Sequence, residues 1–397
     1  MHATDGIFFH IRKILSQRSM QILIVIGLYL LFASHIPVGI HQLLYTMSMG
    51  IKEILVWMMP VTVFFFIAHT VSFFKQKAPL FILSLLAFEA LSNLTSVWYS
   101  YFAAHIATQS LDMIQPYNLQ SSFEPLWEFP YTRPIWWAAD KGCMLGLLIG
   151  CLVAFYRQTN LVHFLAAGKK TMEFILTRFF ARLIPIFVLG FVANMYETQL
   201  LQQIFVQYGV LVLVLIGLLV LYLFFLFLLG TGFRVGLSLT HIRNLLPAGG
   251  IALTSGCSLS TMPWTIASTE KNLRNPNLAQ VLIPATTNIQ QIGDCIANSF
   301  LCFVLYKQFF GIAPGFTTWI SFSLAFALAR FATAAVLGGA IFIMLPIYEM
   351  YLNFTPEMIA IILACNVMLD PIITSTNVMA NGALCRIFEW VWGRGRV

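Results

Sequence analysis

The sequence predicts an all-α, polytopic membrane protein, and two observations carry that prediction: its composition and the order of its apolar segments. Hydrophobic residues make up 59% of the 397 residues, and charged residues make up only 9%. Soluble domains carry about 25% charged residues, so this chain has too few to cover a water-exposed surface. The composition therefore excludes a cytosolic enzyme, a disulfide-rich secreted protein and a nucleic-acid-binding protein.

The seven cysteines and eight histidines indicate neither a cofactor nor a metal centre. No two cysteines form a CxxC motif, all of them lie in or beside apolar stretches, and the histidines form no HExxH motif. Cysteines in such surroundings behave as small buried hydrophobic residues. We therefore predict no bound cofactor and no enzyme activity.

Six apolar segments reach the length of about 20 residues that a helix needs to cross the hydrocarbon core. They are 19–43, 52–75, 78–106, 133–157, 171–195 and 203–231. The first lacks a small-residue cleavage site, so we interpret it as a retained helix rather than a signal peptide. Residues 1–18 before it are predicted to form an amphipathic cytoplasmic N-terminus, and the polar stretch 107–132 an exposed loop.

After the sixth segment the apolar stretches are interrupted. Residues 244–273 form two short arms around small polar residues, and each arm is too short to cross, which predicts a re-entrant hairpin. Residues 315–350 predict a second hairpin of the same kind. Between the two, 277–308 is long enough to span but polar in its middle, which predicts a broken helix. Residues 355–391 form a last helix.

The net charge is +7, and the positions of the basic residues along the chain predict a membrane topology. Basic residues precede the first segment, follow the second, fourth and sixth, follow the first hairpin, and end the chain. All of them fall on one side if both hairpins return to their side of entry. The positive-inside rule then predicts a multi-pass protein of the cell (inner) membrane with both termini in the cytoplasm. Its lipid partner would be the bilayer itself.

Four ionisable residues lie deep in apolar segments, namely Glu89, Asp294, Arg330 and Asp370. Such a residue costs about 2.5–3.5 kcal/mol at the centre of a membrane helix, so we expect it to face an interior or a cavity. A structural ion pair is the simplest explanation for any one of them. Together they leave two uncompensated negative charges, which protons, metal ions or a cationic substrate group would have to balance.

Polar residues of the last segment recur on one helical face. At 100° per residue, the side chains of Asn366, Asp370, Thr374, Asn377 and Asn381 fall within an arc of roughly 80°. Amides that hold helices together are the alternative explanation, but a stripe of this kind favours a solvated site. Two interrupted segments in related positions are typical of transporters whose site lies near the membrane midplane.

The order of these parts resembles the dicarboxylate/amino acid:cation symporters, which have the glutamate-transporter fold. Residues 256–263 (Gly-Cys-Ser-Leu-Ser-Thr-Met-Pro) are similar to the serine-rich first tip of that family, and 332–338 to its second tip. Residues 290–294, six past Pro284, stand at its Asn-Met-Asp-Gly-Thr motif. The resemblance implies eight transmembrane helices plus two re-entrant hairpins.

The same resemblance implies an elevator mechanism in a homotrimer. Segments 19–75 and 133–195 would form the trimeric scaffold, while 78–106 and 203–391 would form the moving transport domain. The family aspartate that takes the amino group of the substrate falls on Asp370. The implied substrate-binding residues are Ser258, Asp294, Thr333, Asp370, Ile373, Thr374 and Asn377. Those implied for cation or proton coupling are Glu89, Gln290, Asp294, Asn377 and Asn381, with Gln290, Asn377 and Asn381 as sodium ligands and Arg330 as a charge partner.

The departures from the family pattern bear on the coupling ion. Sodium-binding aspartates of the family are replaced by Ile292 and Asn381, and a further aspartate of the last helix is Asn366. We therefore hypothesise that protonation of Glu89 or Asp294 replaces some or all of the sodium coupling. The coupling cation is thus sodium or a proton.

A further departure bears on the substrate. The arginine that reads an acidic side chain in glutamate-selective members is Ile373 here, which predicts a small amino acid with a neutral or cationic side chain. Two alternatives stay open: an acidic substrate read by Arg330, and a divergent relative that binds without transporting or conducts ions as a channel. A remote alternative is an intramembrane aspartyl hydrolase using Asp294 and Asp370, whose Gly-x-Gly-Asp signature is broken at Gln291.

Overall fold

The structure is a computed structural model of the whole chain. It describes residues 18–72, 79–110, 123–127, 134, 136–137, 139–156, 159–198, 200–287, 289–333 and 340–394. The regular structure in these ranges is helical throughout. The predicted amphipathic segment 1–18 lies outside them except for Arg18, as does most of the predicted loop 107–132.

The first two helices meet at a proline. Helix α2 runs over Arg18–Phe32, a 3₁₀ turn η1 covers Ala33–His35, and α3 runs over Val38–Ser72. Ile36 is extended, with ψ 129°, because a residue that precedes proline is disfavoured in the α region. The predicted spans 19–43 and 52–75 were therefore wrong in their boundaries: residues 38–43 begin the second helix.

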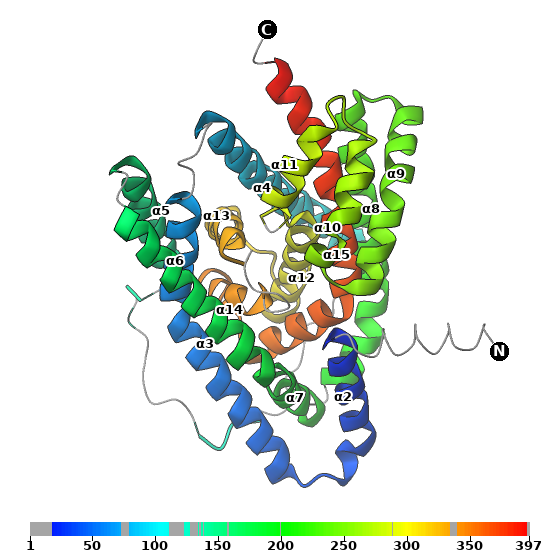
Figure 1. Cartoon of the computed structure of the whole chain (residues 1–397). Coiled ribbons are helices and arrows are strands. Elements are labelled where there is room, and N and C mark those ends of the chain that lie inside the picture. Colours follow the sequence, from blue (N-terminus) through cyan, green and yellow to red (C-terminus); the bar gives the residue numbers. More distant parts are fainter. Residues whose placement is uncertain are drawn as a thin grey trace, which may run out of the picture.

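Helix α3 packs against three later helices to form a first group. These are α5 (Ala139–Tyr156), α6 (Thr159–Phe174) and α7 (Ala181–Glu197), with a π-helical segment η3 (Ile175–Phe180) joining the last two. Figure 1 shows α5 and α6 alongside α3 on one side of the molecule. A Cβ on Gly190 of α7 would lie 2.0 Å from Ser48 Oγ and 2.1 Å from the Leu44 carbonyl oxygen of α3. The glycine thus permits the close crossing of these two helices.

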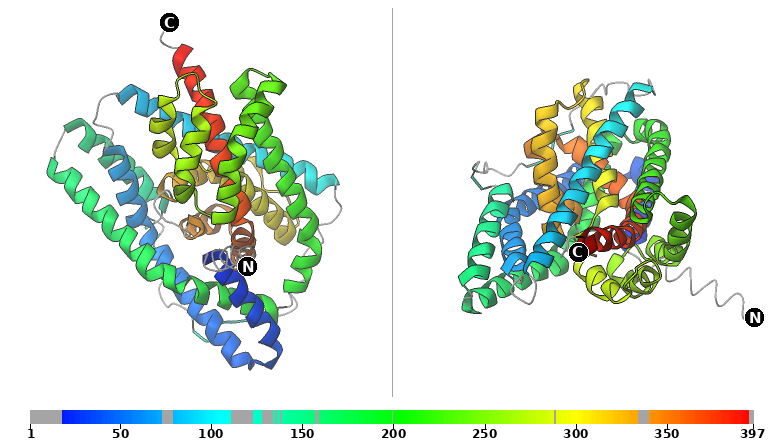
Figure 2. Two further views of the ribbon diagram at one scale, coloured as in Figure 1. Left: turned by 45° about the vertical axis from the view of Figure 1, so that its right-hand side comes forward. Right: turned by 90° about the horizontal axis from the view of Figure 1, so that it is seen from above.

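The remaining long helices form a second group. It contains α4 (Pro79–Ser110), α8 (Leu200–Thr231), α9 (Val235–Ser255), α10 (Ser258–Glu270), α11 (Asn277–Thr286), α12 (Ile292–Phe310), α13 (Phe316–Thr333), α14 (Ala340–Leu352) and α15 (Pro356–Arg394). Figures 1 and 2 agree in placing α8 and α9 opposite α5 and α6, with α12, α13 and α14 between them. Most of α12 is buried, and it packs against α4, α8 and α15. This helix is the centre of the fold.

Two helix–turn–helix pairs occupy the positions predicted for hairpins. The pair α9/α10 begins at Val235, nine residues before the predicted boundary, and turns at Gly256, whose φ of +58° suits glycine. The pair α13/α14 flanks residues 334–339, which lie outside the described ranges. That both pairs are re-entrant in a membrane stays a prediction.

The last helix is bent. Its two parts, Pro356–Asn366 and Met368–Trp392, meet at 60°. Pro371 lies four residues past the bend, where its ring removes the hydrogen bond to the carbonyl of residue 367 and clashes with it. The predicted straight helix was therefore wrong, since Asn366 lies on the other side of the bend from Asp370, although Asn366 Nδ2 still donates to Asn298 Oδ1 of α12 at 2.6 Å.

An ion pair joins the two groups. Lys52 of α3, whose side chain is 6% exposed, places Nζ 2.6 Å from Glu349 Oε1 of α14. Lys52 Nζ also lies 3.7 Å from Glu53 Oε1. The contact therefore ties the first group to the second arm of the α13/α14 pair.

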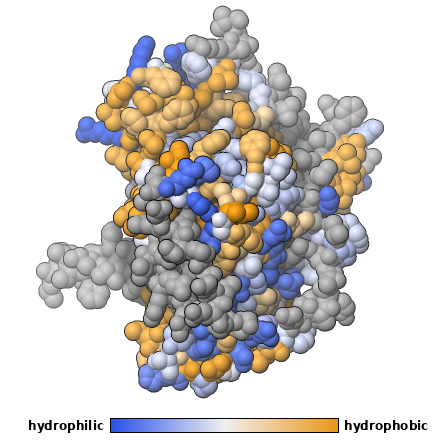
Figure 3. All heavy atoms as spheres, turned by 180° about the vertical axis from the view of Figure 1, so that it is seen from behind, coloured by the Kyte–Doolittle hydropathy of each residue, from blue (hydrophilic) through white to orange (hydrophobic). Residues whose placement is uncertain are grey.

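Much of the surface is apolar. Large hydrophobic side chains are exposed on several helices, among them Leu213 and Val220 of α8 and Phe316 of α13, and Figure 3 shows patches of apolar side chains interspersed with polar ones on one face. Exposed apolar area of this extent is typical of a surface that contacts lipid or another protein. Among the described residues, Gly209–Thr231 is long and apolar enough to cross a membrane as one helix, and the bent α15 would add a second. The count of eight spanning helices stays a prediction.

The α3/α7 crossing gives a first test. Gly190→Ala should destabilise the protein by about 1–3 kcal/mol, because the new methyl group meets backbone as well as a side chain. Gly217→Ala in α8 is the matched control, since nothing lies within 4 Å of its Cβ position. Thermal unfolding in detergent should show a lower midpoint for Gly190→Ala only, and equal midpoints would contradict the crossing.

Candidate functional site

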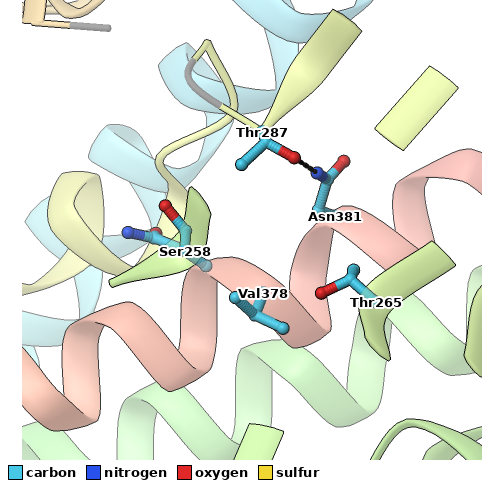
Figure 4. A pocket seen from close by; sticks show the side chains of 6 residues that line it. Ser258, Thr265, Thr287, Val378 and Asn381 are labelled. Atoms are coloured by element: carbon cyan, nitrogen blue, oxygen red, sulfur yellow. Dashed lines mark hydrogen bonds between the residues drawn. The ribbon is translucent and has the colours of Figure 1, made fainter. Parts of the chain in front are cut away.

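A small polar crevice lies where α10, α15 and the end of α11 meet. Its lining residues are Ser258, Thr265, Thr287, Asn377, Val378 and Asn381. Figure 4 shows Thr287 and Asn381 pointing toward each other, with Ser258 and Thr265 of α10 on the other sides. The lining consists of hydroxyl and amide groups together with one valine. The space between these side chains leaves no room for a water molecule, so the crevice is closed in this structure.

Hydrogen bonds between two threonines and an asparagine close one end of the crevice. Thr286 Oγ1 donates to Asn381 Oδ1 at 2.6 Å, and Asn381 Nδ2 donates to Thr287 Oγ1 at 3.4 Å. Thr287 Oγ1 also donates to the Ile283 carbonyl at 2.6 Å, and Thr286 Oγ1 lies 2.8 Å from the Leu282 carbonyl oxygen, so its single proton is shared between that carbonyl and Asn381. Asn381 therefore holds the last helix against the end of α11.

The chain between α11 and α12 is unwound, and α4 supplies partners for its backbone. Asn93 Nδ2 donates to the Ile289 carbonyl at 3.0 Å, and Asn93 Oδ1 accepts from the Gln291 N–H at 3.2 Å. One α4 side chain thus satisfies backbone groups on both sides of Gln290. Buried backbone groups need such partners wherever a helix is interrupted.

Asp294, in the first turn of α12, lies at the centre of a charged cluster. Its Oδ1 is 3.3 Å from Arg330 Nη1 of α13, and its Oδ2 accepts from Asn377 Nδ2 of α15 at 2.7 Å. Asn377 Oδ1 in turn accepts from the Gly293 N–H at 2.7 Å. Asp294 and Asn377 were both predicted as site residues, and the structure brings them into direct contact.

Gly293 permits α12 and α15 to approach closely. A Cβ at this position would lie 2.6 Å from the Ile373 carbonyl oxygen and 2.9 Å from Asn377 Oδ1. Ile373, predicted at the substrate site, is buried, and its backbone rather than its side chain is what meets α12 at Gly293. The contact between Asp294 and Asn377 depends on this close approach of α12 and α15.

Asp370 lies at the tip of the α9/α10 pair. Its Oδ2 is 3.6 Å from the Cβ position of Gly256. Cys257 is the N-cap residue of α10, and Ser258 is the first helical residue. A carboxylate and the N-terminal turn of a helix therefore lie beside the same tip.

The predicted sodium ligands are already used within the protein. The oxygens of Asn377 and Asn381 accept hydrogen bonds from Gly293 and Thr286. In the orientation that satisfies its amide, Gln290 accepts from the Ile292 N–H at 3.2 Å and donates to the Asn377 carbonyl at 2.9 Å. A cation bound there would have to use the second lone pair of each oxygen.

Glu89 is not among the residues that line the crevice. It lies on α4 one turn before Asn93, its residue is 2% exposed, and its Oε2 has no hydrogen-bond partner among the described residues. Thr374 is buried on α15. The side chain of Thr333 lies outside what the structure describes.

Several contributors were not predicted as site residues, among them Asn93 and Thr265. Asn93 follows Glu89 by four residues, so the two share a helical face, and that spacing was a usable signal. Thr265 lies on α10, where Thr261, Thr265 and Thr269 recur every four residues, and that spacing was likewise a usable signal.

Asn377→Ala tests the central hydrogen bonds. It removes the partners of Asp294 Oδ2 and of the Gly293 N–H, and each buried group left without a partner costs about 1–3 kcal/mol. Asn275→Ala is the control, because that side chain is exposed and its backbone N–H keeps the bond to Glu389. A thermal midpoint that is no lower for Asn377→Ala than for the control would argue against the arrangement.

Comparison with known proteins assigns the chain to a family. The profile of the sodium:dicarboxylate symporter family matches residues 140–389, more than half of the chain. The matched range includes the crevice, the Asp294 cluster and both helix–turn–helix pairs. A search of curated proteins found no match. The family consists of membrane-embedded transporters of small molecules rather than enzymes, and this chain belongs to the sodium:dicarboxylate symporter family.

Proposed function

We propose that the protein is a cation-coupled symporter for a small amino acid with a neutral or cationic side chain. The observation that carries the proposal is Asp370 Oδ2 beside the Gly256 tip, 3.6 Å from the Cβ position. A carboxylate there can accept from the ammonium group of an amino acid. The first turn of α10 offers backbone N–H groups, which suit the carboxylate of the same molecule.

The surroundings of Arg330 support a side chain without negative charge. An acidic side chain is best read by a free guanidinium fork, but Arg330 is fully buried and already faces Asp294 and Gln291. The position at which the family resemblance expects an arginine is the buried Ile373.

The two groups of helices fit an elevator mechanism. Helices α2, α3, α5, α6 and α7 would form the fixed scaffold and carry the trimer contacts. The part that moves together with the substrate would consist of α4, α8, α11, α12 and α15, together with the α9/α10 and α13/α14 pairs. Both termini would face the cytoplasm from the cell membrane. This division follows the packing, because most helices contact partners within their own group.

The coupling cation would be sodium or a proton. A buried carboxyl such as Glu89, with one oxygen unpartnered among the described residues, is suited to carry a proton in one state and a charge in another. Asn381 supplies only a neutral oxygen in place of the family carboxylate, and Gln290 also supplies a neutral oxygen, which binds sodium more weakly than a carboxylate does. Proton coupling through Glu89 therefore takes over at least part of the sodium role.

Asp370→Asn tests the substrate assignment. Uptake of radiolabelled amino acids and dicarboxylates into proteoliposomes should identify the best substrate, and this variant should lower its uptake by about 10-fold to 100-fold, because a charge-assisted hydrogen bond is lost. Glu357→Gln, which neutralises a carboxylate at the start of the same helix, should leave uptake unchanged. Uptake of aspartate equal to that of every neutral or basic amino acid would overturn the assignment, as would ion currents with no uptake at all.

Glu89→Gln tests the coupling ion. With sodium absent and a pH step imposed, wild-type protein should accumulate substrate and the variant should not, because glutamine cannot carry the proton. Glu89→Asp, which keeps the acid, should retain part of the proton-driven uptake. Failure of the wild-type protein to respond to the pH step, or an unchanged Glu89→Gln variant, would refute proton coupling at this residue.

A further inference from the structure

Arg330 is the least exposed charged residue of the site. Its exposed fraction is 0%, and it lies on α13, three residues before that helix ends. Nη1 is 3.3 Å from Asp294 Oδ1 and donates to Gln291 Oε1 at 3.0 Å, and the guanidinium carbon lies 4.5 Å from the centre of the Phe326 ring. The two polar partners lie at the start of α12, while the aromatic partner lies on α13 itself.

The charge of this side chain is permanent. An arginine guanidinium does not lose its proton in proteins, and a buried carboxylate is costly unless it is paired and hydrogen-bonded. Asp294 meets both conditions, since Arg330 faces one oxygen and Asn377 donates to the other. The carboxylate is therefore neutralised by the chain itself, whatever the ion content of the solution.

Other titratable groups in the described part of the chain interact electrostatically with this pair, and they add no charge at neutral pH. They are the Cys295 and Cys302 thiols of α12 and the Tyr348 phenol of α14. Thiols and phenols ionise above about pH 8 in their ordinary state. Among the described residues, the electrostatic balance at Asp294 therefore depends on Arg330.

We propose that Arg330 is a tethered counter-cation. Its guanidinium fills the place beside Asp294 that a dissolved monovalent cation would otherwise have to fill. Asp294 therefore contributes no cation site in the wild-type protein, and removal of the guanidinium creates one. This inference concerns the site of the proposed symporter. Its significance for transport rests on that proposed function, but cation binding itself can be measured without substrate.

The test compares four purified proteins in detergent without substrate: wild type, Arg330→Lys, Arg330→Met, and the double variant Arg330→Met with Asp294→Asn. Methionine keeps much of the packing volume on Phe326 and removes the charge. Thermal unfolding is followed during two titrations. Sodium chloride replaces choline chloride at constant ionic strength in the first, and the pH is varied between about 5 and 7.5, below the range where thiols ionise, in the second.

The unfolding midpoint of Arg330→Met should depend on sodium or proton concentration, whereas the midpoints of the other proteins should not show this added dependence. Sodium, or a proton, bound to the exposed Asp294 charge should raise its unfolding midpoint by about 3 °C more than that of the wild type. Arg330→Lys and the double variant should behave as the wild type, because the first keeps a cation and the second has no charge to balance.

Two results would overturn the proposal. One is an Arg330→Met variant whose response to sodium and to pH equals that of the wild type. If Arg330→Met fails to fold, the double variant should recover a monodisperse peak on size exclusion, and failure of that recovery would show that Arg330 acts by packing instead. Since no substrate is present, none of these outcomes depends on whether the protein transports amino acids.

Discussion

The interruption between α11 and α12 is the constraint on which the site depends. An unwound backbone in an apolar interior must find partners for its N–H and C=O groups, and Asn93 of α4 supplies partners for two of them. The other constraint comes from α15, where Asn377 accepts from Gly293. Because both neighbours bind the interruption directly, the break fixes the positions of α4 and α15 as well as its own.

The charged groups follow from the same break. Asp294 lies two residues into α12, where a carboxylate interacts favourably with the positive end of the helix dipole. Arg330 approaches it from α13 and Asn377 from α15, so three separate stretches of sequence meet at one carboxylate. The crevice lies on the other side of Asn377, toward Ser258 and Asn381. Asn377 thus contacts the Asp294 carboxylate and also lines the polar crevice.

Local patterns in the sequence predicted the order of the elements well, and contacts between distant segments poorly. The polar stretch at 286–298 indicated the broken helix, and the amide-rich last segment indicated which face meets it, as Asn377 and Asn381 show. The ends of α2 and α3 were misplaced, because hydropathy continues across Pro37 while the backbone does not. The bend of α15 and the pairing of Arg330 with Asp294 depend on packing between distant segments, and a single sequence carries no direct record of that.

The Lys52–Glu349 contact has a consequence for how the molecule can rearrange. The two side chains belong to helices on opposite sides of the boundary between the groups, and Lys52 has almost no access to water. A buried pair loses stability when one partner is left behind without the other. Any displacement of α14 along α3 must therefore separate this ion pair, and water or another ion would have to replace the partner that each charge loses.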